Sequence, residues 1–274
     1  MKRAQPACVR VCSFLLVLLF FASATGAQLS RLDDLASRLA KELKPLNPHL
    51  VAVADFRSSD GAATPQGHYF AAVFSDYLRG HAKKKFTVAN HMDFDRDLGK
   101  LHISAATFAS AGAVRSNASL IGADVVVTGT VDHNAGSLRI DIVSVRIADQ
   151  KSSRQLSQTL SANEFLESMA TPFPAGVLKA GIAGVSLPTC IQCPDPRYSD
   201  LARRQKISGD AVLMVLVSSG GAAEIIHPVR LLGYGLDEQA YYAIKNWRFK
   251  AATTEEDGKP VAVIVPVQVT FRLY

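Results

Sequence analysis

The chain has 274 residues, of which 48% are hydrophobic and 20% are charged. This balance is typical of a globular protein with room for two ordinary domains, and it excludes an intrinsically disordered chain. The formal net charge is +6, but the first 27 residues carry three basic residues and no acid, so half of the excess lies there. The remaining basic residues do not cluster with aromatic ones, and we expect no nucleic-acid partner.

Residues 1–27 have the layout of a Sec-type signal peptide. A positively charged start precedes an apolar run over 11–21, and small residues follow the run. Because a membrane-spanning helix needs about 20 apolar residues, the short run favours cleavage after Ala24 or Ala27. We therefore expect export to the periplasm, with an uncleaved segment anchored in the inner membrane as the alternative.

Residues 28–168 alternate between helical and β-rich patterns. Apolar residues recur at helical spacing in 30–44, 69–80 and 104–120. Short apolar or β-branched runs predict strands at 50–56, 86–89, 123–131, 137–147 and 154–160. A short loop between the two longest of these runs predicts a hairpin. The sequence therefore predicts an N-terminal α/β domain with a mixed sheet.

The stretch 169–187 holds prolines, glycines and alanines without a period, so we predict an interdomain linker there. The C-terminal block, 188–274, returns to regular patterns. We expect helices at 198–205 and 236–246, hairpin strands at 209–218 and 222–227, an extended piece at 247–250 and a long strand at 261–273. Alternate residues of the last strand are apolar, which places them on one face. The predicted fold class of the whole chain is α+β, with an antiparallel sheet packed on a helix in this block.

Two cysteines, Cys190 and Cys193, remain once the signal peptide is removed. In an oxidising compartment such close thiols favour a local disulfide, with reduced or labile thiols and metal binding as alternatives. A redox-active pair belongs at a helix start after a strand, whereas prolines closely follow this pair. Zinc would need further ligands, and no other histidine or cysteine lies close by in the sequence.

No other pattern matches a catalytic or metal-binding motif. The acidic run at 93–97 lacks the glycine and the glutamate that a calcium loop requires. The loop at 233–235 lacks the third glycine of a dinucleotide-binding fingerprint. The seven histidines are scattered, and none stands near an acid at the spacing of a metal site or a triad. We therefore expect no catalytic residue, no metal and no cofactor. We expect that the protein is not an enzyme. If it were one, the remaining alternative would be a thiol-redox enzyme that uses the two cysteines.

A series of motifs runs through the C-terminal block. They are PRYS (196–199), GDAV (209–212), GYGLDEQA (233–240), AIKNWRF (243–249), GKPV (258–261) and VTFRLY (269–274). In this order they resemble the C-terminal domain of the TonB family, over residues 188–274. The resemblance implies a periplasmic member of an energy-transducer family that binds a short extended segment of outer-membrane receptors by β-strand addition. It also implies a role in energy-coupled transmembrane transport.

Three residues of this block have an expected structural role. Gly235 can take the positive φ that turns the chain tightly into the following helix. Trp247 and Phe249 leave the end of that helix, and we expect them to fill the core between helix and sheet.

The last strand, 261–273, is the expected partner-binding edge. Pro266 lies in its middle and has no N–H, so it fits only where that position faces no paired strand. An edge strand presents unpaired backbone groups to which another strand can add. The expected partner-binding residues are Val265, Val267, Gln268, Thr270 and Arg272. The expected partners are envelope proteins, with TonB-dependent outer-membrane receptors as the family's case and a homodimer through the sheet edges as an alternative.

Two pieces of the N-terminal domain resemble another group of proteins. VAVADF at 51–56 and IGADVVVTGT at 121–130 are similar to strands of the α/β domain of FlgO-, CsgG- and TolB-N-type envelope proteins. This resemblance implies an assembly or scaffolding domain without chemistry of its own. The alternative function is therefore that of a scaffolding or assembly subunit of a cell-envelope complex, led by the N-terminal domain.

Overall fold

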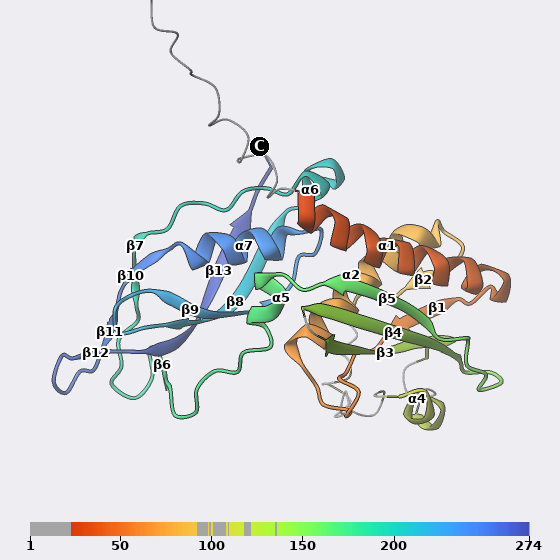
Figure 1. Cartoon of the computed structure of the whole chain (residues 1–274), viewed down its shortest axis with the longest axis horizontal. Coiled ribbons are helices and arrows are strands. Elements are labelled where there is room, and N and C mark those ends of the chain that lie inside the picture. The colour runs from red at the N-terminus through yellow and green to blue at the C-terminus, as the bar shows by residue number, and fades with distance from the viewer. Residues whose placement is uncertain are drawn as a thin grey trace, which may run out of the picture.

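The computed structural model describes residues 23–91, 98, 100, 108, 110–117, 122–134 and 136–273. In this part of the chain two β-sheets, each with helices packed against it, lie side by side (Figure 1). Helices and mixed sheets occur together, which confirms the predicted α+β class. Among the described residues, no helix is both long and apolar enough to cross a membrane. The expected signal peptide lies outside them, except for its last five positions, which begin the first helix.

The N-terminal sheet has five strands in the order β2-β1-β3-β4-β5. Strands β2, β1 and β3 are parallel, whereas β3, β4 and β5 are antiparallel, so the sheet is mixed as predicted. The strands are β1 (Leu50–Val53), β2 (Thr87–Val88), β3 (Val125–Asn134), β4 (Ser137–Arg146) and β5 (Leu156–Ser161). The first strand ends at Val53, short of the predicted 56, which leaves Asp55 beyond the carboxyl end of a parallel strand.

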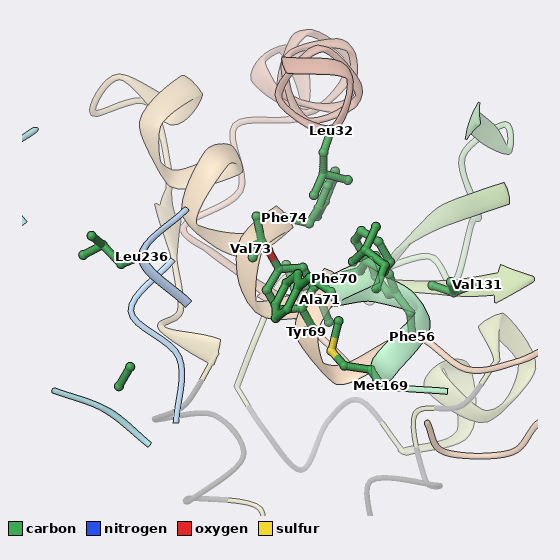
Figure 2. Packing of buried hydrophobic residues seen from close by; sticks show 14 of the residues in the cluster. Leu32, Phe56, Tyr69, Phe70, Ala71, Val73, Phe74, Val131, Met169 and Leu236 are labelled. Carbon is green, nitrogen blue, oxygen red and sulfur yellow. The ribbon is translucent and has the colours of Figure 1, made fainter. Parts of the chain in front are cut away.

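Two helices, α1 (Ser23–Leu43) and α2 (Pro65–Ala82), cover one face of this sheet (Figure 1). A short 3-10 helix, η1 (Lys44–Leu46), continues α1. In α1, Leu32, Leu35, Leu39 and Leu43 are at most 1% exposed. Figure 2 shows Leu32 pointing from α1 toward the aromatic side chains of α2. Each buried leucine contributes about 2 kcal/mol to folding, so packing of this stripe holds the helix in place.

The opposite face of the sheet has an apolar cluster of its own. Ala52, Val126 and Val145 are buried there with Phe108 and Val114. The last of these belongs to α4 (Ala111–Asn117). This helix covers part of the helix predicted over 104–120, and most of the remaining range lies outside the described residues.

The start of α2 lies unusually close to the backbone after β1. A Cβ built on Gly67 would lie 1.9 Å from the carbonyl oxygen of Phe56, so only glycine fits. The hydroxyl of Thr64 caps the helix by accepting from the N–H of Gly67 at 3.0 Å. These contacts hold the next residue, His68, against the end of β1.

The C-terminal sheet has the order β6-β13-β8-β9. Its strands are β6 (Leu178–Lys179), β8 (Gly209–Val217), β9 (Ala223–Arg230) and β13 (Val263–Phe271). Two small antiparallel pairs accompany it, β7 (Thr189–Gln192) with β10 (Arg248–Lys250) and β11 (Ala252–Thr253) with β12 (Pro260–Val261). Its helices are α5 (Glu164–Ser168), α6 (Asp200–Gln205) and α7 (Leu236–Lys245), the last of which packs on β8 and β9.

The prediction of one continuous strand over 261–273 is wrong, because this range holds two strands. Residues 260–261 pair with β11 rather than with the main sheet, so β12 and β13 are separate strands with Ala262 between them. Within β13 the predicted alternation holds, because Val263, Val269 and Phe271 are at most 3% exposed.

The stretch predicted as a linker, 169–187, lies against the C-terminal sheet. Its strand β6 pairs in parallel with Val263 and Ile264, and Val185 is 6% exposed. The two halves of the molecule also share a continuous core. The ring of Phe165 in α5 contacts Tyr69 of α2 and Tyr241 of α7, with ring centroids 5.1 and 5.3 Å apart. The domain boundaries at 168 and 188 stay a prediction.

Candidate functional site

One side of β13 carries backbone groups that no described strand covers. The other side pairs with β8 over its whole length, from Val263 to Phe271. On the open side, β6 pairs only with Val263 and Ile264, and no strand of the described chain pairs there with residues 266–270. We call residues 266–270 the free edge of β13.

The direction of each backbone group along the free edge follows from one hydrogen bond. The carbonyl of Ile264 accepts from the N–H of Ala180, on the β6 side, at 3.1 Å. Because backbone groups alternate in direction along a strand, those of Pro266, Gln268 and Thr270 point the same way, away from β8. The missing N–H of Pro266 therefore costs the sheet no hydrogen bond. Gln268 and Thr270 each present an N–H and a carbonyl at the edge.

The five predicted partner-binding residues differ in their surroundings. Gln268 and Thr270 are exposed on the free edge, and Arg272 is exposed just beyond the end of β13. Val265 is 8% exposed and belongs to the core, and Val267 is half-buried. The backbone N–H and carbonyl groups of both valines point toward β8. Of the five, only Gln268 and Thr270 therefore combine an exposed side chain with an outward-facing backbone.

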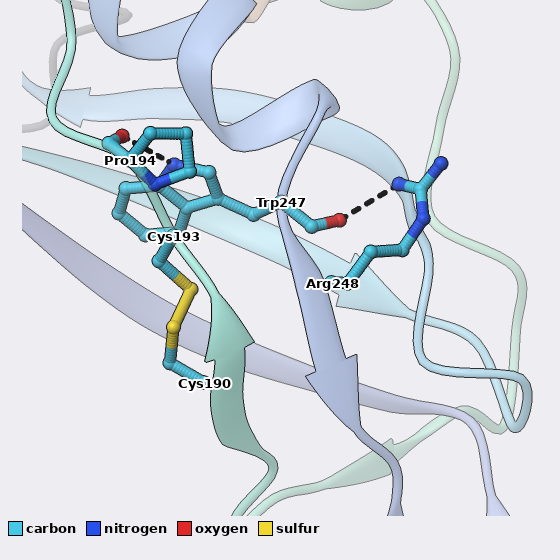
Figure 3. Close-up of a disulfide and its surroundings, with 5 residues drawn as sticks. All are labelled: Cys190, Cys193, Pro194, Trp247 and Arg248. Carbon is cyan, nitrogen blue, oxygen red and sulfur yellow. Dashed lines mark hydrogen bonds between the residues drawn. A yellow bond between two sulfur atoms is a disulfide. The ribbon is translucent and has the colours of Figure 1, made fainter.

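The predicted disulfide between Cys190 and Cys193 is present (Figure 3). Cys190 lies in β7, opposite Phe249 of β10. Figure 3 shows the indole of Trp247 beside Cys193 and Pro194, and its N–H donates to the carbonyl of Pro194 at 2.9 Å. Trp247 is half-buried and covers the disulfide segment, whereas Phe249 is 8% exposed and fills the core as expected.

Two carboxyl groups are buried in the first turn of α7. Asp237 is 1% exposed and accepts from the backbone N–H groups of Leu232 and Gly233, both at 2.8 Å. Glu238 is 3% exposed and accepts from Nδ2 of Asn163, the N-cap of α5, at 2.8 Å. Burial raises the pKa of each carboxyl to about 7. This burial could not be predicted from the sequence, because it arises from the packing of α5 against α7.

The loop that leads into α7 has the expected backbone. Residues 233, 234 and 235 have φ values of 72, 54 and 80°, and Gly235 is the N-cap of the helix. The prediction for Gly235 is therefore confirmed.

A cluster that the sequence analysis missed lies at the end of β1. The Oδ1 atom of Asp55 is 3.0 Å from Nδ1 of His68 and 2.9 Å from Nε2 of His91. Burial alone would raise the pKa of Asp55, but the two imidazoles hold it well below the usual range of a carboxyl group. The three side chains form the only group among the described residues that could hold a metal ion. We call it the His–Asp cluster.

Spacing alone could not have revealed this cluster. Its histidines stand 13 and 36 residues from the aspartate, and they come together only through the fold. The acidic run at 93–97, which was considered and set aside as a calcium loop, lies outside the described residues.

Among solved structures, the chain is similar to the LpoB C-terminal domain from Salmonella enterica. The identity is 12% and the TM-score 0.37, over 48% of this chain and 96% of that one. It is also similar to lipoprotein GNA1162 from Neisseria meningitidis, with 13% identity and a TM-score of 0.32 over 47% of this chain and 87% of that one. At these TM-scores the likenesses carry no functional inference. The resemblance of the N-terminal domain to FlgO, CsgG and TolB proteins stays a prediction.

No curated protein matched the chain. The C-terminal block, however, matches both a solved structure and a family model. The TonB C-terminal domain of Pseudomonas aeruginosa is similar at 20% identity, with a TM-score of 0.26 over 36% of this chain and 96% of that one. Residues 194–273 match the family model of the Gram-negative bacterial TonB protein C-terminal. Residues 194–273 therefore resemble a TonB C-terminal domain, as the motifs of this block predicted.

Proposed function

We propose that this is a non-catalytic protein of the cell envelope that binds partner proteins by β-strand addition at the free edge of β13. The observation that carries the proposal is the set of outward-facing backbone groups of Pro266, Gln268 and Thr270, within a domain that matches the TonB family. The partner contributes an extended segment, as a TonB-dependent outer-membrane receptor would. In this role the protein serves energy-coupled transmembrane transport.

The backbone of the free edge supplies most of the affinity in this proposal. An added strand can bond to the N–H and carbonyl groups of Gln268 and Thr270 and to the carbonyl of Pro266. Each such bond is worth about 1 kcal/mol net, so five of them suit a reversible complex. The side chains of Gln268 and Arg272 are exposed and select among partners.

We place the protein in the periplasm. The signal-peptide pattern of residues 1–27 supports this, and a disulfide between Cys190 and Cys193 persists in an oxidising compartment. Cleavage after Ala24 or Ala27 leaves a mature chain that begins at Thr25 or Gln28. Mass spectrometry of the purified protein tests this, and an intact Met1 on membrane-embedded protein would contradict it.

The strand-addition proposal is tested by removing one backbone donor. Proline at position 268 deletes an N–H that points away from β8, so the Gln268→Pro variant keeps the β8–β13 ladder. The matched control is Gln268→Ala, which loses the same side chain but keeps the N–H. Each variant is used to capture partners from envelope extract. The captured partner is then titrated against each variant by calorimetry.

We expect Gln268→Ala to bind within about twofold of the wild type. Gln268→Pro should bind about fivefold more weakly or worse, which is the effect of losing one bond of about 1 kcal/mol. Circular dichroism checks that both variants keep the fold. Wild-type affinity in a folded Gln268→Pro variant would show that the binding edge lies elsewhere.

A further inference from the structure

The His–Asp cluster lies where parallel sheets commonly hold ligands. Asp55 follows β1 and His91 follows β2, and these neighbouring strands are parallel, so both residues lie beyond carboxyl ends. Ligands of open sheets bind outside the carboxyl ends of parallel strands. The third residue, His68, comes from the first turn of α2, which the close contact between Gly67 and Phe56 holds against the same end of the sheet.

The hydrogen bonding of His91 orients its second ring nitrogen toward the aspartate. Its Nδ1 lies 2.9 Å from the carbonyl oxygen of Val53, which can only accept, so Nδ1 carries a proton. Nε2 then faces Asp55 with either a second proton or its lone pair. A lone pair 2.9 Å from a carboxylate oxygen is repelled unless a cation lies between them. A histidine that donates one ring N–H to a backbone carbonyl is the usual arrangement of a metal ligand.

The distances within the cluster are close to those of a metal site. The three ligand atoms all lie within 4.8 Å of one another. Ligand atoms of a tetrahedral zinc ion are about 3.3 Å apart, given bonds of about 2.0–2.1 Å. The observed separations of 2.9 and 3.0 Å to Asp55 therefore need to grow by only a few tenths of an ångström.

Solvent can reach one side of the cluster. The side chain of His91 is 2% exposed, whereas those of Asp55 and His68 are 17% and 25% exposed. The cluster is therefore more open on the side of Asp55 and His68 than at His91. On the buried side, His91 is held in place by its contact with the carbonyl of Val53.

We propose that Asp55, His68 and His91 bind a divalent first-row transition-metal ion, with Zn²⁺ as the expected ion. The ligands are Oδ1 of Asp55, Nδ1 of His68 and Nε2 of His91. Two imidazoles and one carboxylate suit zinc, whereas Mg²⁺ and Ca²⁺ prefer oxygen ligands throughout. The bound ion ties the ends of β1 and β2 to the start of α2, and so stabilises the N-terminal sheet.

The experiment uses the mature full-length chain, with any affinity tag removed and metal stripped by EDTA and dialysis. Zinc chloride is titrated by calorimetry, and cobalt chloride is titrated by its visible absorption, with magnesium and calcium chloride as comparisons. We expect one Zn²⁺ per chain, cobalt absorption bands typical of four or five ligands, and no saturable binding of Mg²⁺ or Ca²⁺.

Three variants identify the ligands. Asp55→Asn, His68→Gln and His91→Gln should each weaken zinc binding by roughly 100-fold or more. His91 is buried, so His68→Gln, at a partly exposed position, tests the site if His91→Gln fails to fold.

The matched control is His81→Gln. His81 also pairs with an aspartate, Asp33, at 2.7 Å, but it belongs to no three-ligand group among the described residues. We expect this variant to bind zinc as the wild type does. The proposal is overturned if the wild type shows no saturable zinc binding, or if His68→Gln or Asp55→Asn binds with wild-type affinity. The cluster would then consist of ion pairs alone.

Discussion

Replacing Glu238 by glutamine tests how the burial of its carboxyl group makes folding depend on pH. The carboxyl is 3% exposed at the start of α7 and accepts a hydrogen bond from Asn163, the N-cap of α5. Glutamine keeps the shape and the accepting oxygen but cannot ionise. Burial raises the pKa of Glu238 from 4.5 to about 7, the bond from Asn163 opposes this rise, and the nearby Asp237 adds to it.

The raised pKa makes the stability of the wild type depend on pH. The folded state binds the proton more tightly than the unfolded state, so stability is complete below the unfolded pKa and is lost as pH rises through the folded pKa. With 4.5 in the unfolded state and about 7 in the folded state, the loss from this one group between pH 5 and pH 8 is about 2.5 kcal/mol. Asp237, whose pKa is also raised to about 7, adds a further loss that the variant retains.

The assay is unfolding by guanidinium chloride, followed by circular dichroism at pH 5 and pH 8. We expect the free energy of unfolding of Glu238→Gln to fall by about 2.5 kcal/mol less than that of the wild type over this interval. Glu224→Gln is the control, because Glu224 is exposed on the neighbouring strand β9, and it should follow the wild type. Equal losses in Glu238→Gln and the wild type would refute the reasoning.

Two further predictions concern stability. Gly67→Ala should destabilise the protein by about 2 kcal/mol or more, because the new Cβ would lie 1.9 Å from a backbone oxygen, whereas Gly80→Ala in the same helix meets nothing within 4 Å and should stabilise it by about 0.5–1 kcal/mol. Thermal unfolding of both variants measures this, and equal midpoints would contradict it. The Cys190→Ser, Cys193→Ser double variant should lose only about 1–2 kcal/mol, since the closed loop is very short. Ellman titration of the denatured wild type from the periplasm should find no free thiol, and two free thiols would contradict the disulfide.

The elements that could be predicted are those whose own residues carry a regular pattern. The leucine stripe of α1 and the β-branched runs of β3 and β4 are long enough to show their period, and the structure has them near the predicted positions. Strands β6 and β7 could not be predicted. They have two and four residues, all exposed, and they exist because β13 and β10 offer them partners. A sequence pattern records which face of a strand is buried, but not which strand lies beside it.

The same limit explains the error in the last strand. Apolar residues alternate from Val261 to Phe271, so the sequence predicts one strand, yet the pairing partner changes at Ala262 and divides it. Pro266 was informative for a different reason. Its missing N–H is a covalent property that restricts the pairing itself, and so it indicated a free side of the strand before any partner was known.

Two things concealed the His–Asp cluster: its residues lie far apart in the sequence, and the first strand was predicted to end three residues too late. The predicted run over 50–56 placed Asp55 inside a strand, where its side chain would have belonged to one face of the sheet. With β1 ending at Val53, Asp55 lies beyond a carboxyl end, and His91 likewise lies beyond the carboxyl end of β2, which ends at Val88. Because β1 and β2 are parallel neighbours, those two ends meet at one edge of the sheet. An acid and a histidine that each follow a short apolar run are therefore worth testing as a pair, even when many residues separate them in the sequence.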